Sequence, residues 1–386
     1  MKKTISLIIV FFLFSISLLY PKIVKLNITG PIDSISEEYF LESFVKIRSM
    51  SEVELIILQI DTPGGFDTSM RQIIKTIFSS PVPVVSYISP QGARGASAGF
   101  FITLAADIAV MAPGTNMGAA HPVSVLPTAG GSDNEGKEKG EEKKAEKNAD
   151  IMMEKVTNDA VSYIKSIAIA RNRNTQLAME AVSQSKSYTA NECLENGLID
   201  YIALDMQDLL KKLEGKTVKM LNGSEYPLRL SEKEIVEIDL SFRQKFLKTI
   251  TNPSLAYFLF ILGIAGLYLE FSHPGGVLPG IIGGICLLLA FLSFQILPIN
   301  YIGLLLILLS IGLFLAEIKI QGFGVLGFGG IIAFFLGSLM LIDGPIPEMR
   351  PSMTLIIILS ICFGLTILFL TYKVFQAMGN RLVTGP

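Results

Sequence analysis

The sequence is poor in cysteine and histidine, and it has no tryptophan. Only three of its 386 residues are cysteines, at Cys193, Cys286 and Cys362, and only two are histidines, at His121 and His273. The cysteines are too far apart to form a disulfide framework or a zinc-binding pair. Two histidines do not make a site of several imidazoles. The sequence therefore predicts no metal centre.

Charge is also scarce and unevenly distributed. Charged residues make up 17% of the chain, and the formal net charge is −2. Nucleic-acid binding needs a concentrated basic surface, so this class of function is excluded. Residues 254–376 are almost uncharged, whereas residues 22–250 resemble an ordinary globular sequence. The composition thus predicts a soluble part followed by a membrane part.

The first twenty residues form a hydrophobic leader. Two lysines precede an uncharged apolar run from Ile5 to Tyr20, and Ser15 and Ser17 offer a small-x-small cleavage site. This layout is typical of a secretory signal peptide. The run is also long enough to leave an uncleaved signal anchor open for residues 1–20. In both cases the domain that follows is carried out of the cytoplasm.

Residues 22–240 alternate strands with amphipathic helices. IVKLNI, VELIILQI and VPVVSYI read as strands, the last two buried, with helical segments between them. This alternation predicts a mostly parallel α/β sheet. One segment differs, because residues 128–150 are rich in both charge signs and contain no aromatic residue. Such a composition buries little surface, so a mobile loop is expected there, followed by a helix that begins at Ile151.

The last third of the chain predicts a polytopic helical membrane domain, residues 254–376. A short juxtamembrane segment, 241–253, precedes it. Five long apolar spans in series make a buried soluble core an unsatisfactory explanation. They lie near residues 254–271, 276–297, 300–316, 322–342 and 354–375.

Charges around the spans indicate the topology. Five spans after an extracytoplasmic domain place the C-terminus in the cytoplasm, where Lys373 and Arg381 agree with the positive-inside rule. Arg243, Lys245 and Lys248 precede the first span and disagree with it. We interpret those three as part of an amphipathic helix at the membrane surface. The expected location is therefore a multi-pass cell-membrane protein with its soluble domain outside.

Two short motifs of the soluble domain carry residues suited to chemistry. In IDTPGG, Gly64 and Gly65 follow a buried strand, and their N–H groups are free to hold an oxyanion. In GASAG, Ser97 stands where an apolar helix begins, so the Ala98 N–H lies at the positive end of the helix dipole. From residue type alone, a small helix-start residue is the favoured interpretation of Ser97.

Taken together, the motifs resemble a known family. IDTPGG, then GASAG about thirty residues on, MAPGTNMGAAHPV, SYTANECLENGLID and the membrane segment LEFSHPGGVLPGIIGGICLLLA are similar to the NfeD family of ClpP-class, membrane-anchored serine proteases. The resemblance implies an α/β ClpP/crotonase-like soluble domain followed by an all-α polytopic membrane domain. It implies Ser97 as nucleophile, with an oxyanion hole formed by the N–H groups of Gly65 and Ala98. Gly64 would contact the substrate.

The base is less well determined by the sequence. His121 is the only histidine of the soluble domain and the obvious chemical candidate, or else a substrate-binding residue. The resemblance implies instead a serine–lysine dyad whose lysine opens the helix after the charged segment, which is Lys155 in KVTNDAVSYIKSIA. Residue reasoning alone does not select it over Lys144 or Lys147. If Lys155 is the base, we expect it to be buried beside an apolar pocket, which favours its neutral amine.

The resemblance also implies the reaction and the partners. It implies an endopeptidase that cleaves hydrophobic segments of membrane-associated proteins such as stomatin- or prohibitin-like partners. The enzyme would be surrounded by membrane lipid, assembled as a homodimer or larger, and without a cofactor. Two alternatives stay open, an inactive membrane scaffold that binds stomatin-like proteins and crotonase-type acyl-CoA chemistry. Residues 377–386 lie where long family members begin an OB-fold domain, which is absent here or cut short.

Overall fold

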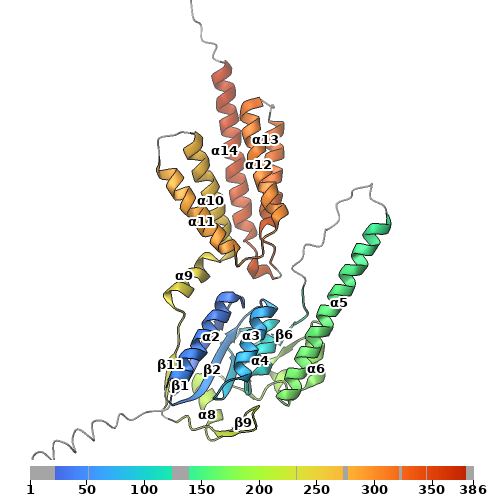
Figure 1. Ribbon diagram of the computed structural model, residues 1–386, viewed down its shortest axis with the longest axis vertical. Coiled ribbons are helices and arrows are strands. Elements are labelled where there is room, and N and C mark those ends of the chain that lie inside the picture. The colour runs from blue at the N-terminus through green and yellow to red at the C-terminus, as the bar shows by residue number, and fades with distance from the viewer. Residues whose placement is uncertain are drawn as a thin grey trace, which may run out of the picture. The chain divides into compact units, whose positions relative to one another are not determined.

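The chain folds into two compact units (Figure 1). The α/β unit comprises residues up to 244, and the helical unit comprises residues from 245 onward. The expected leader, 1–20, part of the charged segment and the end of the tail lie outside the described residues. The computed structural model describes residues 22–50, 52–123, 139–231, 233–272, 277–320, 324–344 and 346–379.

The α/β unit is built on a parallel sheet, as the alternation of strands and helices predicts. Its six strands have the order β11-β1-β2-β3-β5-β8, and every recorded pairing between them is parallel. Three short strands form a second sheet in the order β4-β6-β7. The bounds are β1 Lys22–Thr29, β2 Val53–Asp61, β3 Val84–Ile88, β4 Arg94–Ala96, β5 Ile108–Met111, β6 Asn116–Gly118, β7 Ser187–Thr189, β8 Tyr201–Ile202 and β11 Glu234–Glu237.

Both faces of the large sheet are covered, which explains why its strands are continuously apolar. On β2, Ile56 and Leu58 face a core shared with six helices, whereas Leu55 and Ile57 face a smaller core shared with α8 and the β9–β10 hairpin. The first core includes α2 Ser34–Ser49, α3 Asp67–Phe78, α4 Ala98–Ala105, α5 Lys139–Ala170, α6 Thr175–Ser183 and α7 Ala190–Glu195. The second includes α8 Met206–Leu213, β9 Thr217–Lys219 and β10 Glu225–Pro227.

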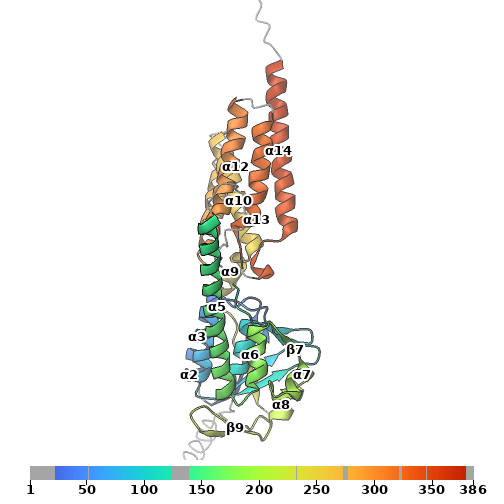
Figure 2. The same ribbon diagram turned by 90° about the vertical axis from the view of Figure 1, so that its right-hand side faces the viewer.

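Helix α5 begins earlier than the sequence predicts. The structure has one continuous helix from Lys139, so residues 139–150 are helical rather than part of a loop (Figure 2). The reason is local, because glutamate, lysine and alanine are strong helix formers even where no core is available. Residues 128–138 of the expected loop lie outside the described residues.

The helical unit contains the apolar segments of the last third of the chain. It follows α9 Phe242–Ile250, and its helices are α10 Pro253–Ser272, α11 Leu278–Phe294, α12 Tyr301–Ile320, α13 Val325–Leu341 and α14 Met353–Gly379. In the described residues, Pro253–Phe271 and Pro347–Thr366 are long and apolar enough to cross a membrane, and α11, α13 and most of α12 are shorter apolar helices.

Glycines allow these helices to pack closely. A Cβ added to Gly283 of α11 would lie 2.8 Å from the carbonyl oxygen of Gly263 on α10, so no side chain fits between the two backbones. A second close contact is polar, since the Tyr257 hydroxyl of α10 lies 2.8 Å from the Ser338 hydroxyl of α13. Small residues and buried hydroxyl pairs of this kind are typical of helix interfaces in membranes.

Candidate active site

The turn after β2 is held against β4. The Thr62 N–H donates to the Arg94 carbonyl at 2.7 Å, and the Ala96 N–H donates to the Thr62 carbonyl at 3.1 Å. The Asp61 carboxylate accepts from the Arg94 N–H at 3.1 Å. These bonds bring the end of IDTPGG beside GASAG, so the two motifs that the sequence singled out do form one site.

Ile32 clamps the Pro-Gly-Gly turn from the other side. Its N–H donates to the Gly64 carbonyl and its carbonyl accepts from the Phe66 N–H, both at 2.8 Å. A Cβ on Gly65 would lie 2.0 Å from that same Ile32 carbonyl oxygen. The second glycine of the motif is therefore required by this contact.

Gly64 is equally constrained by the serine. Its φ of +116° is a conformation that side chains rarely adopt, and an added Cβ would lie 2.6 Å from Ser97 Cβ and 3.0 Å from Ser97 Oγ. The absence of a side chain at Gly64 leaves room around the Ser97 hydroxyl.

Ser97 has an unusual backbone conformation. Its φ is 51° and its ψ is −116°, in a region where a non-glycine residue stores strain of about 1–3 kcal/mol. The position is fixed by the Ser97 N–H, which donates to the Gly118 carbonyl at 2.8 Å. Strain of this kind at an enzyme site holds a side chain in a geometry that the relaxed chain would not adopt.

Ser97 stands directly before α4, at the start of a helix as the sequence predicts, but its side chain does not cap that helix. No hydrogen bond of Ser97 Oγ to any described residue is recorded, and the side chain is only half-buried. A serine that neither caps the helix nor bonds elsewhere is available for chemistry.

Two backbone N–H groups next to these motifs have no recorded hydrogen-bond partner among the described residues. Ala98 is the first residue of α4, where the N–H has no partner within the helix. Among the described residues, neither the Ala98 N–H nor the Gly65 N–H donates a recorded hydrogen bond. Free N–H groups beside a strained serine are the arrangement that stabilises an oxyanion.

His121 is held a short distance along the chain from β6. Its Nδ1 lies 3.0 Å from the Val182 carbonyl oxygen. A carbonyl only accepts, so Nδ1 donates the hydrogen of this bond. The structure records no contact of His121 with Ser97.

Lys155 does not meet the expectation of burial. It is exposed, and no hydrogen bond or ion pair to another described residue is recorded for it. Ala160 and Ile164 form the buried side of α5. Lys155 precedes Ala160 by five residues, which is about 140° around the helix, so it lies away from the packed side. The sequence shows the apolar stripe but not how far Lys155 lies from it.

A contact that the sequence does not reveal attaches α5 to the site. Arg71 of α3 forms an ion pair with Asp159, one turn after Lys155. The guanidinium also lies 4.3 Å from the ring centre of Tyr163, which stacks on Phe101 of α4 at 6.0 Å. Helix α5 is thereby fixed to α4, the helix that follows Ser97.

The described part of the chain offers no obvious metal site. No group of three or more histidine, cysteine, aspartate or glutamate side chains is placed to hold an ion among those residues. The groups assembled here are a hydroxyl and two amides, which suit acyl transfer.

Comparison with known proteins agrees with this chemistry. Residues 25–222 match the family model of the NfeD1b N-terminal domain, and residues 254–373 match that of the NfeD integral membrane domain. The chain is 34% identical to the membrane-bound protease PH1510 of Pyrococcus horikoshii, over 88% of this chain and 73% of that one. It is 29% identical to the membrane protein NfeD1b of Bacillus subtilis, over 81% of this chain and 65% of that one.

A solved structure is also similar. A mutant of a membrane-bound stomatin-specific protease in complex with a substrate peptide is 31% identical, with a TM-score of 0.49, and the match covers 60% of this chain and 98% of the other. From the two family models and the relative with 34% identity, we conclude that the chain belongs to the NfeD family and is a membrane-bound serine protease.

Proposed function

We propose that Ser97 is the nucleophile, with Lys155 as its base and the N–H groups of Gly65 and Ala98 as the oxyanion hole. The observation that carries the proposal is the state of Ser97, whose strained backbone and unbonded hydroxyl stand beside the Gly64–Gly65 turn. The remaining roles follow from what such a nucleophile requires.

The reaction is peptide-bond hydrolysis through an acyl-enzyme. Ser97 Oγ bonds to the substrate carbonyl carbon while its proton passes to the Lys155 amine, and the carbonyl oxygen becomes the oxyanion. The C–N bond then breaks, and the departing amine takes the proton back from Lys155. Water attacks the ester in the same way and releases the acid. Each oxyanion donor contributes about 3–4 kcal/mol in comparable enzymes.

This mechanism requires Lys155 of α5 to lie close to Ser97 during proton transfer. Proton transfer requires the base within about 3 Å of the nucleophile, and such contacts are often completed only when substrate binds. Because Lys155 is exposed, the proposal requires that the middle of α5 approaches Ser97 in the working enzyme. His121 is the second candidate base, supported by the Nδ1 contact with the Val182 carbonyl, which leaves Nε2 as the ring nitrogen not engaged in that bond.

We infer that the substrates are hydrophobic segments of membrane-associated proteins. The similar solved protease is described as stomatin-specific and binds a substrate peptide, which supports a stomatin- or prohibitin-like partner. The apolar helices support a multi-pass arrangement in the membrane. We propose that five helices cross the bilayer, that the protease domain lies outside the cytoplasm and that at least two copies assemble. Residues 1–20 would direct that export.

The test is cleavage of hydrophobic peptides by the full-length chain in detergent. We expect Ser97→Ala to lower kcat/KM by at least about a thousandfold, and Lys155→Ala by a similar factor. Lys165→Ala is the matched control, because Lys165 is another exposed lysine of the same helix. Activity that survives Ser97→Ala overturns the nucleophile. Full activity in Lys155→Ala with loss in His121→Ala moves the base to His121.

A further inference from the structure

Thr62 connects the two short motifs from inside the fold. It stands between Asp61, the last residue of β2, and the Pro-Gly-Gly turn, and it is fully buried. Its hydroxyl accepts from the Gly64 N–H at 3.1 Å and donates to the Gly64 carbonyl at 3.2 Å. Both backbone polar groups of Gly64 are therefore bonded to one side chain.

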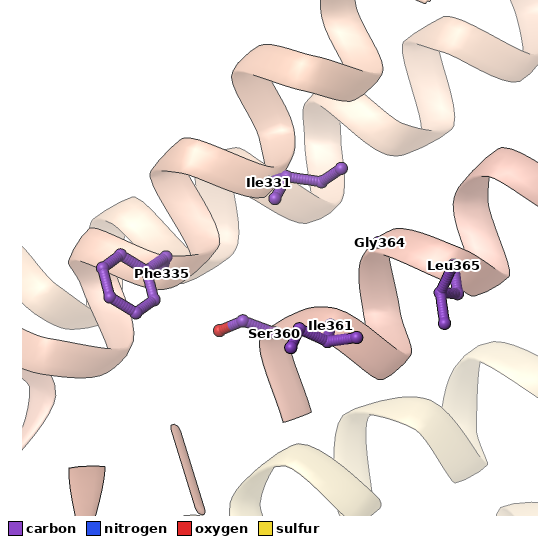
Figure 3. Close-up of a pocket in the computed structure, with 6 residues that line it drawn as sticks. All are labelled: Ile331, Phe335, Ser360, Ile361, Gly364 and Leu365. Carbon is purple, nitrogen blue, oxygen red and sulfur yellow. The ribbon is translucent and has the colours of Figure 1, made fainter. Parts of the chain in front are cut away.

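Burial alone does not give a hydroxyl such partners in this chain. Ser360 lines a groove of about 270 Å³ between α13 and α14 of the helical unit (Figure 3), and its hydroxyl is enclosed. That hydroxyl has no hydrogen-bond partner among the described residues. The two bonds of Thr62 thus reflect the conformation of its own turn, in which Gly64 has a φ of +116°.

The bond to the Gly64 carbonyl sets the direction of the Gly65 N–H. These two groups belong to one peptide unit, which is planar and trans, so the N–H points opposite to the carbonyl. The Gly64 carbonyl accepts from two donors, the Thr62 hydroxyl and the Ile32 N–H. Two donors on one carbonyl restrict rotation of the peptide unit, so the Gly65 N–H keeps a single direction.

The methyl group of Thr62 contacts the other motif. A Cβ added to Gly99 would lie 2.4 Å from Thr62 Cγ2, so this methyl occupies the space that a side chain at Gly99 would need. Gly99 is the second residue of α4 and follows Ala98, whose N–H is the other proposed oxyanion donor. One side chain thus contacts both parts of the proposed oxyanion hole, its hydroxyl at Gly64 and its methyl at Gly99.

We propose that Thr62 is a positioning residue of this protease, which sets the direction of the Gly65 N–H and its separation from the Ala98 N–H. The inference rests on the proposed function of these two N–H groups as the oxyanion hole. Thr62 itself is not exposed to substrate, because it is fully buried and its hydroxyl is engaged by Gly64. The oxyanion forms only along the reaction, so misplaced donors lower kcat and leave substrate binding unchanged.

Two substitutions at Thr62 separate the hydroxyl from the methyl, with kcat and KM measured by peptide cleavage with the full-length chain in detergent. Thr62→Val removes the hydroxyl, and we expect kcat to fall about ten- to a hundredfold with KM within about twofold, since a misdirected donor loses part of what a deleted donor loses. Thr62→Ser keeps the hydroxyl, and its kcat should stay within about threefold of wild type. Thr115→Val is the matched control, because Thr115 is also buried but bonds the Ala112 carbonyl, outside both motifs.

The methyl contact has a test that does not depend on Thr62→Val. Gly99→Ala should lower kcat more than about tenfold, because its Cβ meets the Thr62 methyl. Adding Thr62→Ser removes that methyl, and the next atom, Cγ2 of Ile60, lies 3.8 Å away. The double variant should therefore recover kcat to within about threefold of wild type. Wild-type kcat in Gly99→Ala, or no recovery in the double variant, overturns the inference.

A tetrahedral inhibitor shows whether the oxyanion site itself is affected. Ser97 Oγ bonds to the carbonyl carbon of a peptide aldehyde, and the aldehyde oxygen then occupies the oxyanion hole. Inhibition of Thr62→Val should weaken by the factor by which its kcat falls. Equal inhibition of Thr62→Val and wild type contradicts the positioning role.

The remaining outcomes separate this inference from the proposed function. Unchanged kcat in Thr62→Val, while Ser97→Ala is inactive, overturns the role of Thr62 alone. Equal losses of kcat in Thr62→Val and Thr62→Ser, or in Thr62→Val and Thr115→Val, also overturn it. Cleavage that survives Ser97→Ala overturns the proposed function instead.

Discussion

The two units place their large and small residues in opposite ways. In the α/β unit, Ile56 and Leu58 are fully buried between sheet and helices. In the helical unit, Leu288 is 70% exposed and Phe328 is 68% exposed, while Gly283 lies against the neighbouring helix. The difference follows from the surrounding medium, because water drives large apolar side chains inward whereas lipid does not. Helices in lipid are held instead by close packing and buried hydroxyl pairs.

The largest effect in this comparison is expected at Gly65 of the α/β unit. Like Gly283 of the helical unit, this glycine lies directly against a neighbouring backbone. Gly65→Ala should lower kcat/KM by about a hundredfold or more, because the new Cβ displaces an oxyanion donor from the Ile32 carbonyl. Gly284→Ala of α11 is the control, since nothing lies within 4 Å of that position and no left-handed φ is recorded there. Peptide cleavage measures both variants, and equal activity would contradict the role of Gly65.

Truncating one large side chain in each unit tests the comparison directly. Ile56→Ala should lower the opening free energy of β2 amides by about 2–5 kcal/mol, because it leaves a cavity. Leu288→Ala should change that of α11 amides by less than about 0.5 kcal/mol, since its side chain faces outward. Hydrogen exchange of the full-length chain reads the two units separately. Similar losses of opening free energy in β2 and α11 would contradict the difference in side-chain burial between the two units.

Two adjacent glycines, Gly283 and Gly284, test the role of close packing within the helical unit. Gly283→Ala should destabilise the α10–α11 pair by about 1–3 kcal/mol, because its Cβ meets backbone atoms of α10. Gly284→Ala meets nothing within 4 Å and should stabilise α11 slightly through its better helix propensity. Thermal midpoints in detergent should therefore move in opposite directions. Two shifts of the same sign would count against packing as the cause.

The smallest effect concerns a buried hydroxyl of the α/β unit. The Tyr39 hydroxyl donates to the Ile238 carbonyl, and burial raises its pKa to about 12. The unfolded chain loses this proton near pH 10 and the folded chain does not, so stability falls as pH rises from about 10 to 12. The thermal midpoint of Tyr39→Phe should decline less over that interval than that of the wild type. Parallel declines would exclude Tyr39 as a contributor.

Much of the α/β unit could be predicted because its signals are local. The apolar runs of β1, β2 and β3 mark strands whatever surrounds them, and the spacing of IDTPGG and GASAG anticipated the contact of Gly64 with Ser97. The start of α5 at Lys139 was missed, because low burial was interpreted as a loop although the composition favours a helix.

The rest depends on tertiary contacts that one sequence does not display. The exposure of Lys155 is set by the side of α5 that packs, which Ala160 and Ile164 determine. The ion pair of Arg71 with Asp159 joins residues 88 positions apart.

The two hydrogen bonds of Ile32 have a consequence for the energetics of catalysis. They fix the Gly64–Gly65 turn as the protein folds, so the N–H that we propose as an oxyanion donor is already ordered before any substrate binds. A donor that is rigid in advance stabilises developing charge without reorganising. Ile32 is not among the residues that we propose to contact the reacting atoms. Without its two hydrogen bonds, however, the Gly65 N–H would have to be ordered again in each catalytic cycle.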